Sequence, residues 1–180
     1  MKDISFHITD ITQNSVRAGA KRIDVELLQK NDVLSFVITD DGIGMSAETI
    51  ARITDPFYTT RTTRKVGLGV PFLVQNAEQC GGSVHINSTI GQGTRVEAEF
   101  VLSNIDCPPL GNLASTLMML LIGNPDIETT IHFQHDAKKF SISTSDLREA
   151  AGDIPIAHPT VANLLERILQ DHLDTVFDFN

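Results

Sequence analysis

The alternation of apolar and polar residues predicts a helix followed by two strands at the start of the chain. The residues that recur at helical spacing are Ile4, Ile8, Ile11, Ser15 and Ala18. This spacing places them on one face of an amphipathic helix, and Gly19 suits its C-terminal end. Residues 23–27 and 34–38 then alternate between apolar and polar. With a turn at residues 30–32 between them, they are predicted to form an antiparallel hairpin.

The next sixty residues predict two more helices and a second hairpin. A short helix is expected after Ser46, which is a good N-cap residue, and another from about Leu68 to Gly81, with Pro71 in its first turn. Between them, residues 55–66 lack any period and predict a long loop. Strands at residues 84–86 and 96–100 follow. This order predicts an α+β fold, a two-layer sandwich with helices on one face of a mixed, mostly antiparallel sheet.

The composition changes at residues 107–109, which read Cys-Pro-Pro. We therefore expect one domain over residues 1–104 and a small C-terminal α/β extension over residues 105–180. The extension is predicted to hold a helix near residues 113–121, a hairpin over residues 128–142 and a final amphipathic helix over residues 161–176. It matches no motif, and it can complete the fold, form a homodimer or bind a partner.

The overall composition favours a soluble cytoplasmic protein. The chain has 180 residues, of which 41% are hydrophobic and 21% charged, with a net charge of -9. This acidity disfavours binding to nucleic acid, and no apolar stretch is long enough for a membrane span. Two cysteines are too few for a disulfide framework or a cysteine-based zinc site. Against the acidic background, Arg61, Arg64 and Lys65 form a local basic cluster.

The predicted first helix carries three polar residues that suit a nucleotide site. Asn14 lies mid-helix, where its amide oxygen can coordinate a hard cation such as Mg²⁺. Arg17, one turn on, can contact phosphate oxygens, and Asp10, one turn earlier, can orient or deprotonate an attacking water. Taken alone, these three residues are more typical of a solvated helix face.

The end of the second predicted strand is a candidate for base recognition. Asp40 is followed by Gly42 and Gly44. A carboxylate at a strand end can accept a hydrogen bond from an adenine amino group, and the glycines let the backbone approach the base closely. The same residues also form ordinary turns, since Asp-Gly pairs are common turn formers.

Two later segments complete the pattern. Gly67, Leu68 and Gly69 open a helix whose free N–H groups can bind phosphate, or they form only a permissive junction between loop and helix. Thr94 enters the last strand of the second hairpin after Gly91-Gln92-Gly93. It can bond adenine or a water in the pocket, although a single threonine is common in strands.

In this order, the segments resemble the Bergerat-fold (GHKL) ATPases, the superfamily of gyrase, the heat-shock-90 chaperones, histidine kinases and MutL. The resemblance covers about residues 3–102. HITDITQNSVRAGA is similar to the asparagine box, ITDDGIGM to the first glycine box, DPFYTT to the phenylalanine box of histidine kinases, and VGLGV to the second glycine box. GQGTRVEAEF is similar to the closing glycine-threonine segment.

The resemblance implies a role for each matching position. Asn14 would hold Mg²⁺, Asp40 would bind the adenine amino group, Gly67 and Gly69 would contact phosphates, and Thr94 would support adenine. Residues 55–66 would form a mobile lid over ATP, with Arg61, Arg64 and Lys65 closing on the phosphates.

Two positions depart from the family pattern. Many ATP-hydrolysing members have Glu where this chain has Asp10, which is one methylene shorter and weakens the case for water activation. Many histidine kinases have Lys where this chain has Arg17, a change that a phosphate contact tolerates.

The sequence leaves the fate of the phosphate open. The domain that carries the acceptor histidine in a typical histidine kinase is not seen before the asparagine box, and His7 is expected to be structural or on the surface. Three functions stay open: a kinase-like ATPase that phosphorylates or regulates a separate protein in signalling, a slow ATPase that acts as a conformational switch, and a non-enzymatic nucleotide sensor. Lys138 and Lys139 are expected to be solvated rather than catalytic.

Overall fold

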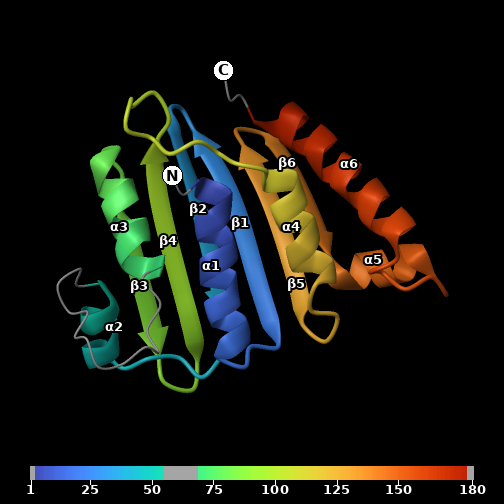
Figure 1. Cartoon of the computed structure of the whole chain (residues 1–180), viewed down its shortest axis with the longest axis horizontal. Coiled ribbons are helices and arrows are strands. Elements are labelled where there is room, and N and C mark those ends of the chain that lie inside the picture. The colour runs from blue at the N-terminus through green and yellow to red at the C-terminus, as the bar shows by residue number, and fades with distance from the viewer. Residues whose placement is uncertain (1–2, 55–68, 178–180) are drawn as a thin grey trace.

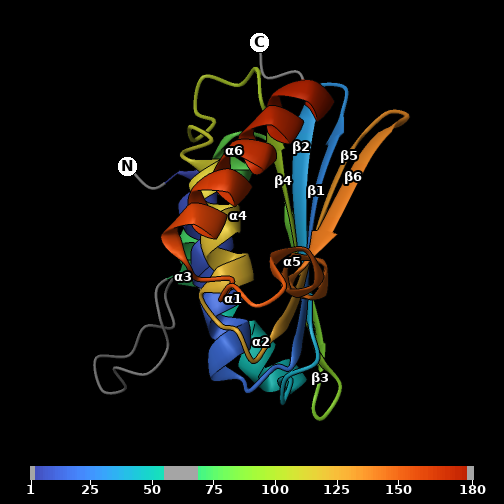
Figure 2. The ribbon, with the colours of Figure 1, turned by 90° about the vertical axis from the view of Figure 1, so that its right-hand side faces the viewer.

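The computed structural model describes residues 3–54 and 69–177 as a helical layer packed on a six-stranded sheet (Figure 1). Helices α1 (Ile4–Arg17), α3 (Gly69–Gln79), α4 (Leu113–Ile122) and α6 (Pro159–Val176) lie on one face of the sheet (Figure 2). The short helix α2 (Ala47–Thr54) packs against α3, and α5 (Thr144–Ala151) lies beside the ends of β5 and β6. This confirms the predicted α+β sandwich.

The sheet has the strand order β3-β4-β2-β1-β5-β6. Its strands are β1 (Arg22–Lys30), β2 (Val33–Asp40), β3 (Val84–Thr89), β4 (Gly93–Val101), β5 (Glu128–His135) and β6 (Lys138–Ser143). Neighbouring strands are antiparallel except β1 and β5, which pair in parallel from Arg22 opposite Glu128 to Gln29 opposite His135. The two predicted N-terminal hairpins and the C-terminal hairpin are confirmed, and the strands of the extension continue the same sheet.

One hydrophobic core lies between the sheet and the helices. It begins at Ile4 on α1, includes Phe36 and Phe100 on the central strands, and extends through Phe133 on β5 to Phe177. The alternation in β1, where every second residue from Ile23 to Gln29 is buried, directs one side of each strand to this core. The opposite sides of the strands carry mostly polar residues.

Side-chain caps mark the starts of the two short helices, α2 and α5. The Ser46 hydroxyl accepts a hydrogen bond from the Thr49 N–H at 3.2 Å, as expected for the start of α2. Ser143 and Asp146 form a reciprocal capping box at the start of α5, a helix that the apolar pattern did not predict.

Among the helices of residues 3–54 and 69–177, none combines the length and apolar character that crossing a membrane requires.

Candidate functional site

Asp40, the last residue of β2, is a buried carboxylate with both oxygens held in place. Only 8% of this residue is exposed to solvent. The Ser15 hydroxyl donates to Oδ2 at 2.6 Å, and the main-chain N–H of Gly42 donates to Oδ1 at 2.9 Å. Because each carboxylate oxygen has two acceptor sites, Asp40 keeps acceptor capacity toward whatever lies in front of it.

A pocket of about 270 Å³ lies in front of Asp40. Asn14 and Thr94 also line it, and most of its wall is apolar. The apolar side chains come from six segments of the fold and include Ile11, Ile43, Ile53, Val70, Ile86 and Val96. The volume is close to the lower end of the range of about 300–1,000 Å³ typical of small-molecule sites. An apolar slot with one buried carboxylate suits a flat aromatic ring that carries a hydrogen-bond donor.

Thr94 lies directly opposite Asp40 in the ladder between β2 and β4. Its hydroxyl is 2.9 Å from the hydroxyl of Ser88 on the neighbouring strand β3. Ser88 also donates to the carbonyl of Gly93 at 2.8 Å and accepts from the N–H of Met45 at 2.8 Å. Ser88 therefore joins the segment after β2 to the hairpin that carries Thr94.

Glycine is required where the segment after β2 meets the β3–β4 hairpin. Gly44 has φ of +66°, and a Cβ there would lie 2.0 Å from the carbonyl oxygen of Thr89. Gly93 has φ of +102°, and its Cβ would lie 1.8 Å from the carbonyl oxygen of Asp40. Both neighbours are backbone atoms, so these two glycines allow a close backbone approach that any side chain would prevent. Gly42 is also confined, because its Cβ would lie 2.9 Å from that of Ala18.

Helix α1 carries the other predicted residues along the edge of the pocket. Asn14 is exposed and accepts a hydrogen bond from the Arg17 guanidinium at 3.3 Å. Asp10 is half-buried one turn earlier, and its carboxylate lies against the first residue of α3, since a Cβ on Gly69 would be 1.5 Å from Asp10 Oδ2. The structure thus brings Asp10 and Gly69 together beside Asn14. Arg61, Arg64, Lys65, Gly67 and Leu68, with the whole of the expected lid over residues 55–66, lie outside the described residues.

Asp41 fixes the turn that follows Asp40. Its Oδ1 accepts hydrogen bonds from the main-chain N–H groups of Lys21 at 2.7 Å and Arg22 at 2.9 Å. Burial acts to raise the pKa of this carboxyl, but the main-chain donors outweigh that effect and leave the pKa below its ordinary value. Asp41 therefore ties the loop of the site to the start of β1.

The sequence predictions did not include Ser15, Ser88 or Asp41 as site residues. Ser15 could have been found from the sequence, because it is a polar residue at a position of the apolar stripe of α1. In the structure it is only 3% exposed. A buried hydroxyl requires a partner, and Asp40 is that partner. Ser88 left no signal that composition or spacing could reveal. His7, expected to be structural or on the surface, is buried between α1 and α3 with Nε2 2.8 Å from the Asn76 amide nitrogen.

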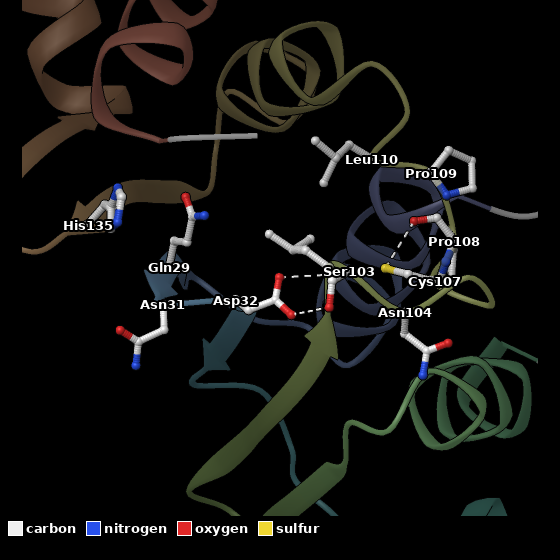
Figure 3. A pocket seen from close by; sticks show the side chains of 11 residues that line it. Gln29, Asn31, Asp32, Ser103, Asn104, Cys107, Pro108, Pro109, Leu110 and His135 are labelled. Atoms are coloured by element: carbon white, nitrogen blue, oxygen red, sulfur yellow. Dashed lines mark hydrogen bonds between the residues drawn. The ribbon is translucent and has the colours of Figure 1, made fainter. Parts of the chain in front are cut away.

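A second, more polar pocket lies at the other end of β2 (Figure 3). It has a volume of about 550 Å³ and is formed by the turn before Val33, the segment that follows β4, Gln29 of β1 and His135 of β5. Asp32 accepts hydrogen bonds there from the main-chain N–H of Ser103, at 3.1 Å, and from its hydroxyl. None of the described residues that the nucleotide motifs predicted lines this pocket. The pocket at Asp40 is therefore the candidate site.

Comparisons with known proteins match the part of the chain that contains this pocket. Residues 3–104 match the family described as histidine kinase-, DNA gyrase B-, and HSP90-like ATPase. The chain is 33% identical over 88 residues to the sensor kinase CckA of Brucella abortus, covering 48% of this chain and 9% of the kinase. It is 26% identical over 107 residues to the sensor histidine kinase YxdK of Bacillus subtilis, covering 56% of this chain and 33% of that protein. The chain thus spans one third or less of these two relatives.

A solved structure supports the fold beyond the region that the family match covers. The crystal structure of the N-terminal domain of a DNA repair protein superposes with a TM-score of 0.59 at 14% sequence identity. The match covers 87% of this chain and 59% of that one. Since 87% is more than residues 1–104 can supply, the similarity in fold includes part of the C-terminal extension.

Proposed function

Since the chain belongs to the histidine kinase-, DNA gyrase B-, and HSP90-like ATPase family, we propose that it binds ATP with Mg²⁺ in the pocket at Asp40. We propose further that it phosphorylates or regulates a separate partner protein in signalling. The observation that carries the binding proposal is the buried Asp40 carboxylate at the end of an apolar pocket of about 270 Å³. An adenine ring can pack between such apolar walls, and its amino group can donate a hydrogen bond to the carboxylate.

The residues beside the pocket suit the phosphate end of ATP. The described residues contain no group of three His, Cys, Asp or Glu side chains that could hold a metal ion unaided. Mg²⁺ is commonly held by one or two protein oxygens together with substrate phosphates and waters. The exposed amide oxygen of Asn14 is suited to that part, and the guanidinium of Arg17 beside it can turn to a phosphate oxygen.

Asp10 is the proposed residue for orienting or activating a water. Its carboxylate lies beside Gly69, at the N-terminal end of α3, where free main-chain N–H groups favour a phosphate. This arrangement would put the carboxylate near the terminal phosphate of a bound nucleotide. It supports a role in hydrolysis or transfer without selecting between them.

Replacing Asp40 tests the binding proposal directly. In Asp40→Asn, the amide oxygen can still accept the Gly42 N–H, but the amide nitrogen replaces one acceptor of the carboxylate. Calorimetry should therefore show the affinity for ATP falling severalfold or more. Asp24→Asn is a matched control, because Asp24 is half-buried on the side of β1 away from the core and does not line the pocket, and the affinity of this variant should stay within about twofold of the wild type. An unchanged affinity for ATP in Asp40→Asn would contradict the assignment of the site.

One observation favours the conformational-switch function as a second candidate. Helix α1, which carries Asp10 and Asn14, packs against α4 of the C-terminal extension. A change in α1 on nucleotide binding would therefore reach the extension. Incubation with γ-labelled ATP, alone and with cell lysate, separates the candidates: a labelled protein supports the kinase, free phosphate alone supports the switch, and neither product with retained ATP binding supports the sensor.

A further inference from the structure

The hydrogen bonds of Ser88 fix the direction of the Thr94 hydroxyl. Ser88 has one hydroxyl proton and three polar neighbours: the Met45 N–H, the Gly93 carbonyl and the Thr94 hydroxyl, at 2.8, 2.8 and 2.9 Å. A carbonyl oxygen can only accept, so the Ser88 proton goes to Gly93. All three contacts are then satisfied only if Thr94 donates its own proton to Ser88. Thr94 Oγ1 is left with acceptor capacity alone.

Asp40 and Thr94 consequently both present acceptors to the pocket. Asp40 contributes a carboxylate, which has no proton to donate. Its Oδ2 already takes the proton of Ser15, which also lines the pocket, at 2.6 Å. Thr94, opposite Asp40 in the sheet, contributes an oxygen whose proton is used elsewhere. A ligand group placed between Asp40 and Thr94 must therefore supply the donors.

We infer that Ser88 is a positioning residue that sets base specificity: by taking the Thr94 proton, it makes the pocket accept a 6-aminopurine and reject a 6-oxopurine. This inference rests on the proposed binding of ATP. A 6-amino group offers protons to both acceptors, whereas a 6-oxo group turns a lone pair toward them. Ser88 acts without touching the base, because it lies on the neighbouring strand and does not line the pocket.

The surroundings of Ser88 hold this arrangement still. Ser88 and Thr94 are partners in the β3–β4 ladder, so their separation is set by the sheet. The N–H of Gly91 donates to the carbonyl of Ile43 at 2.8 Å, which joins the same hairpin to the segment after β2 a second time. Thr94 is β-branched, and its χ1 is therefore restricted within the strand.

The test compares the dissociation constants of ATP and inosine triphosphate, whose base carries a 6-oxo group. The wild type should bind ATP more tightly. In Ser88→Ala the Thr94 proton loses its acceptor and can turn to a 6-oxo group, so the preference for ATP should shrink by about three- to tenfold. If Ser88 only supported the fold, both nucleotides would lose affinity equally. An unchanged ratio in the folded variant would therefore overturn the inference.

Three further variants make the result decisive. Ser88→Thr keeps the hydroxyl and should restore the wild-type preference. Ser83→Ala removes a half-buried serine that bonds Glu99 at the other end of the hairpin, and it should leave the preference unchanged. If circular dichroism shows that Ser88→Ala is unfolded, Thr94→Val decides, since it removes the acceptor itself and should also reduce the preference for ATP.

The outcomes also separate this inference from the function on which it rests. A wild type that binds neither nucleotide overturns the proposed function. A wild type that binds both equally, or one that prefers ATP while folded Ser88→Ala or Thr94→Val keeps the same preference, overturns only the role of Ser88. Loss of the preference in Ser83→Ala would likewise contradict the inference.

Discussion

Gly44 and Gly91 lie on the two sides of the contact between the segment after β2 and the β3–β4 hairpin. Alanine at each of them measures how much this contact contributes to the free energy of unfolding. Gly44 and Gly91 both have positive φ, +66° and +77°. A Cβ on Gly44 would lie 2.0 Å from the carbonyl oxygen of Thr89, whereas a Cβ on Gly91 would meet nothing within 4 Å. Alanine at Gly91 therefore introduces only backbone strain, and alanine at Gly44 introduces the same strain and a collision with main chain.

The expected destabilisation follows from these geometries. A left-handed conformation costs a residue other than glycine about 1–2 kcal/mol, and this is the prediction for Gly91→Ala. In Gly44→Ala, the loop must also move away from the hairpin, which breaks the hydrogen bonds from Gly91 N–H to the Ile43 carbonyl and from Met45 N–H to Ser88. At about 0.5–1.5 kcal/mol each, their loss brings the total for Gly44→Ala to about 2–5 kcal/mol.

Urea unfolding followed by circular dichroism measures both variants under one condition. Thermal midpoints give a second estimate, because 1 kcal/mol lowers the midpoint of a chain of this size by about 2–4 °C. Nucleotide affinity should fall in Gly44→Ala but hold in Gly91→Ala, since only the former separates the loop from the hairpin. Equal destabilisation of the two variants would refute the close packing of the loop on Thr89.

Two further predictions concern groups with perturbed pKa values. Burial, together with the neighbouring Cys80 thiol, raises the pKa of Cys107 to about 11. The rate at which iodoacetamide alkylates Cys107 should therefore rise about tenfold per pH unit between pH 8 and 10. A rate that peptide mapping finds to be independent of pH would contradict this. The lowered pKa of Asp41 adds stability above its unfolded pKa that is lost as pH falls through the folded pKa. Asp41→Asn should cost about 1 kcal/mol at pH 7, and urea unfolding should show this difference shrinking below about pH 4; a constant difference would count against the Asp41 hydrogen bonds.

Local patterns predicted most of the elements because each of them has a strong period or a clear turn. The spacing of Ile4, Ile8 and Ile11 defines α1, and the alternation from Ile23 defines β1. Helix α5 was missed because it buries only Thr144 and Leu147, so its apolar pattern is weak. Its start was nevertheless readable, since Ser143 followed three residues later by Asp146 fits a capping box.

The parallel pairing of β1 with β5 could not be predicted from local patterns. Turn chemistry determines which neighbouring strands form hairpins, but the partners Arg22 and Glu128 are far apart in the sequence. The packing of the whole fold decides this pairing, which places β5 next to β1 within the sheet. The site also combines features that a local pattern predicts with features that it cannot predict. The glycines that permit close backbone approach belong to a motif, whereas the direction of the Thr94 hydroxyl proton is set by Ser88 on the neighbouring strand.

Helix α1 connects the C-terminal segment with the candidate site. The first N–H groups of a helix have no partner within it, and here the N–H of Ile4 donates to the Pro109 carbonyl at 2.9 Å and that of Ser5 to the Leu110 carbonyl at 3.0 Å. The segment after residue 104 thus caps the first turn of α1, while Asn14 and Arg17 occupy its last turns. The independence of residues 1–104 stays a prediction, but a helix of 14 residues, about 20 Å long, carries both contacts. Because the helix is continuous, a displacement of Asn14 by a bound nucleotide would also act on the hydrogen bonds that hold Pro109 and Leu110.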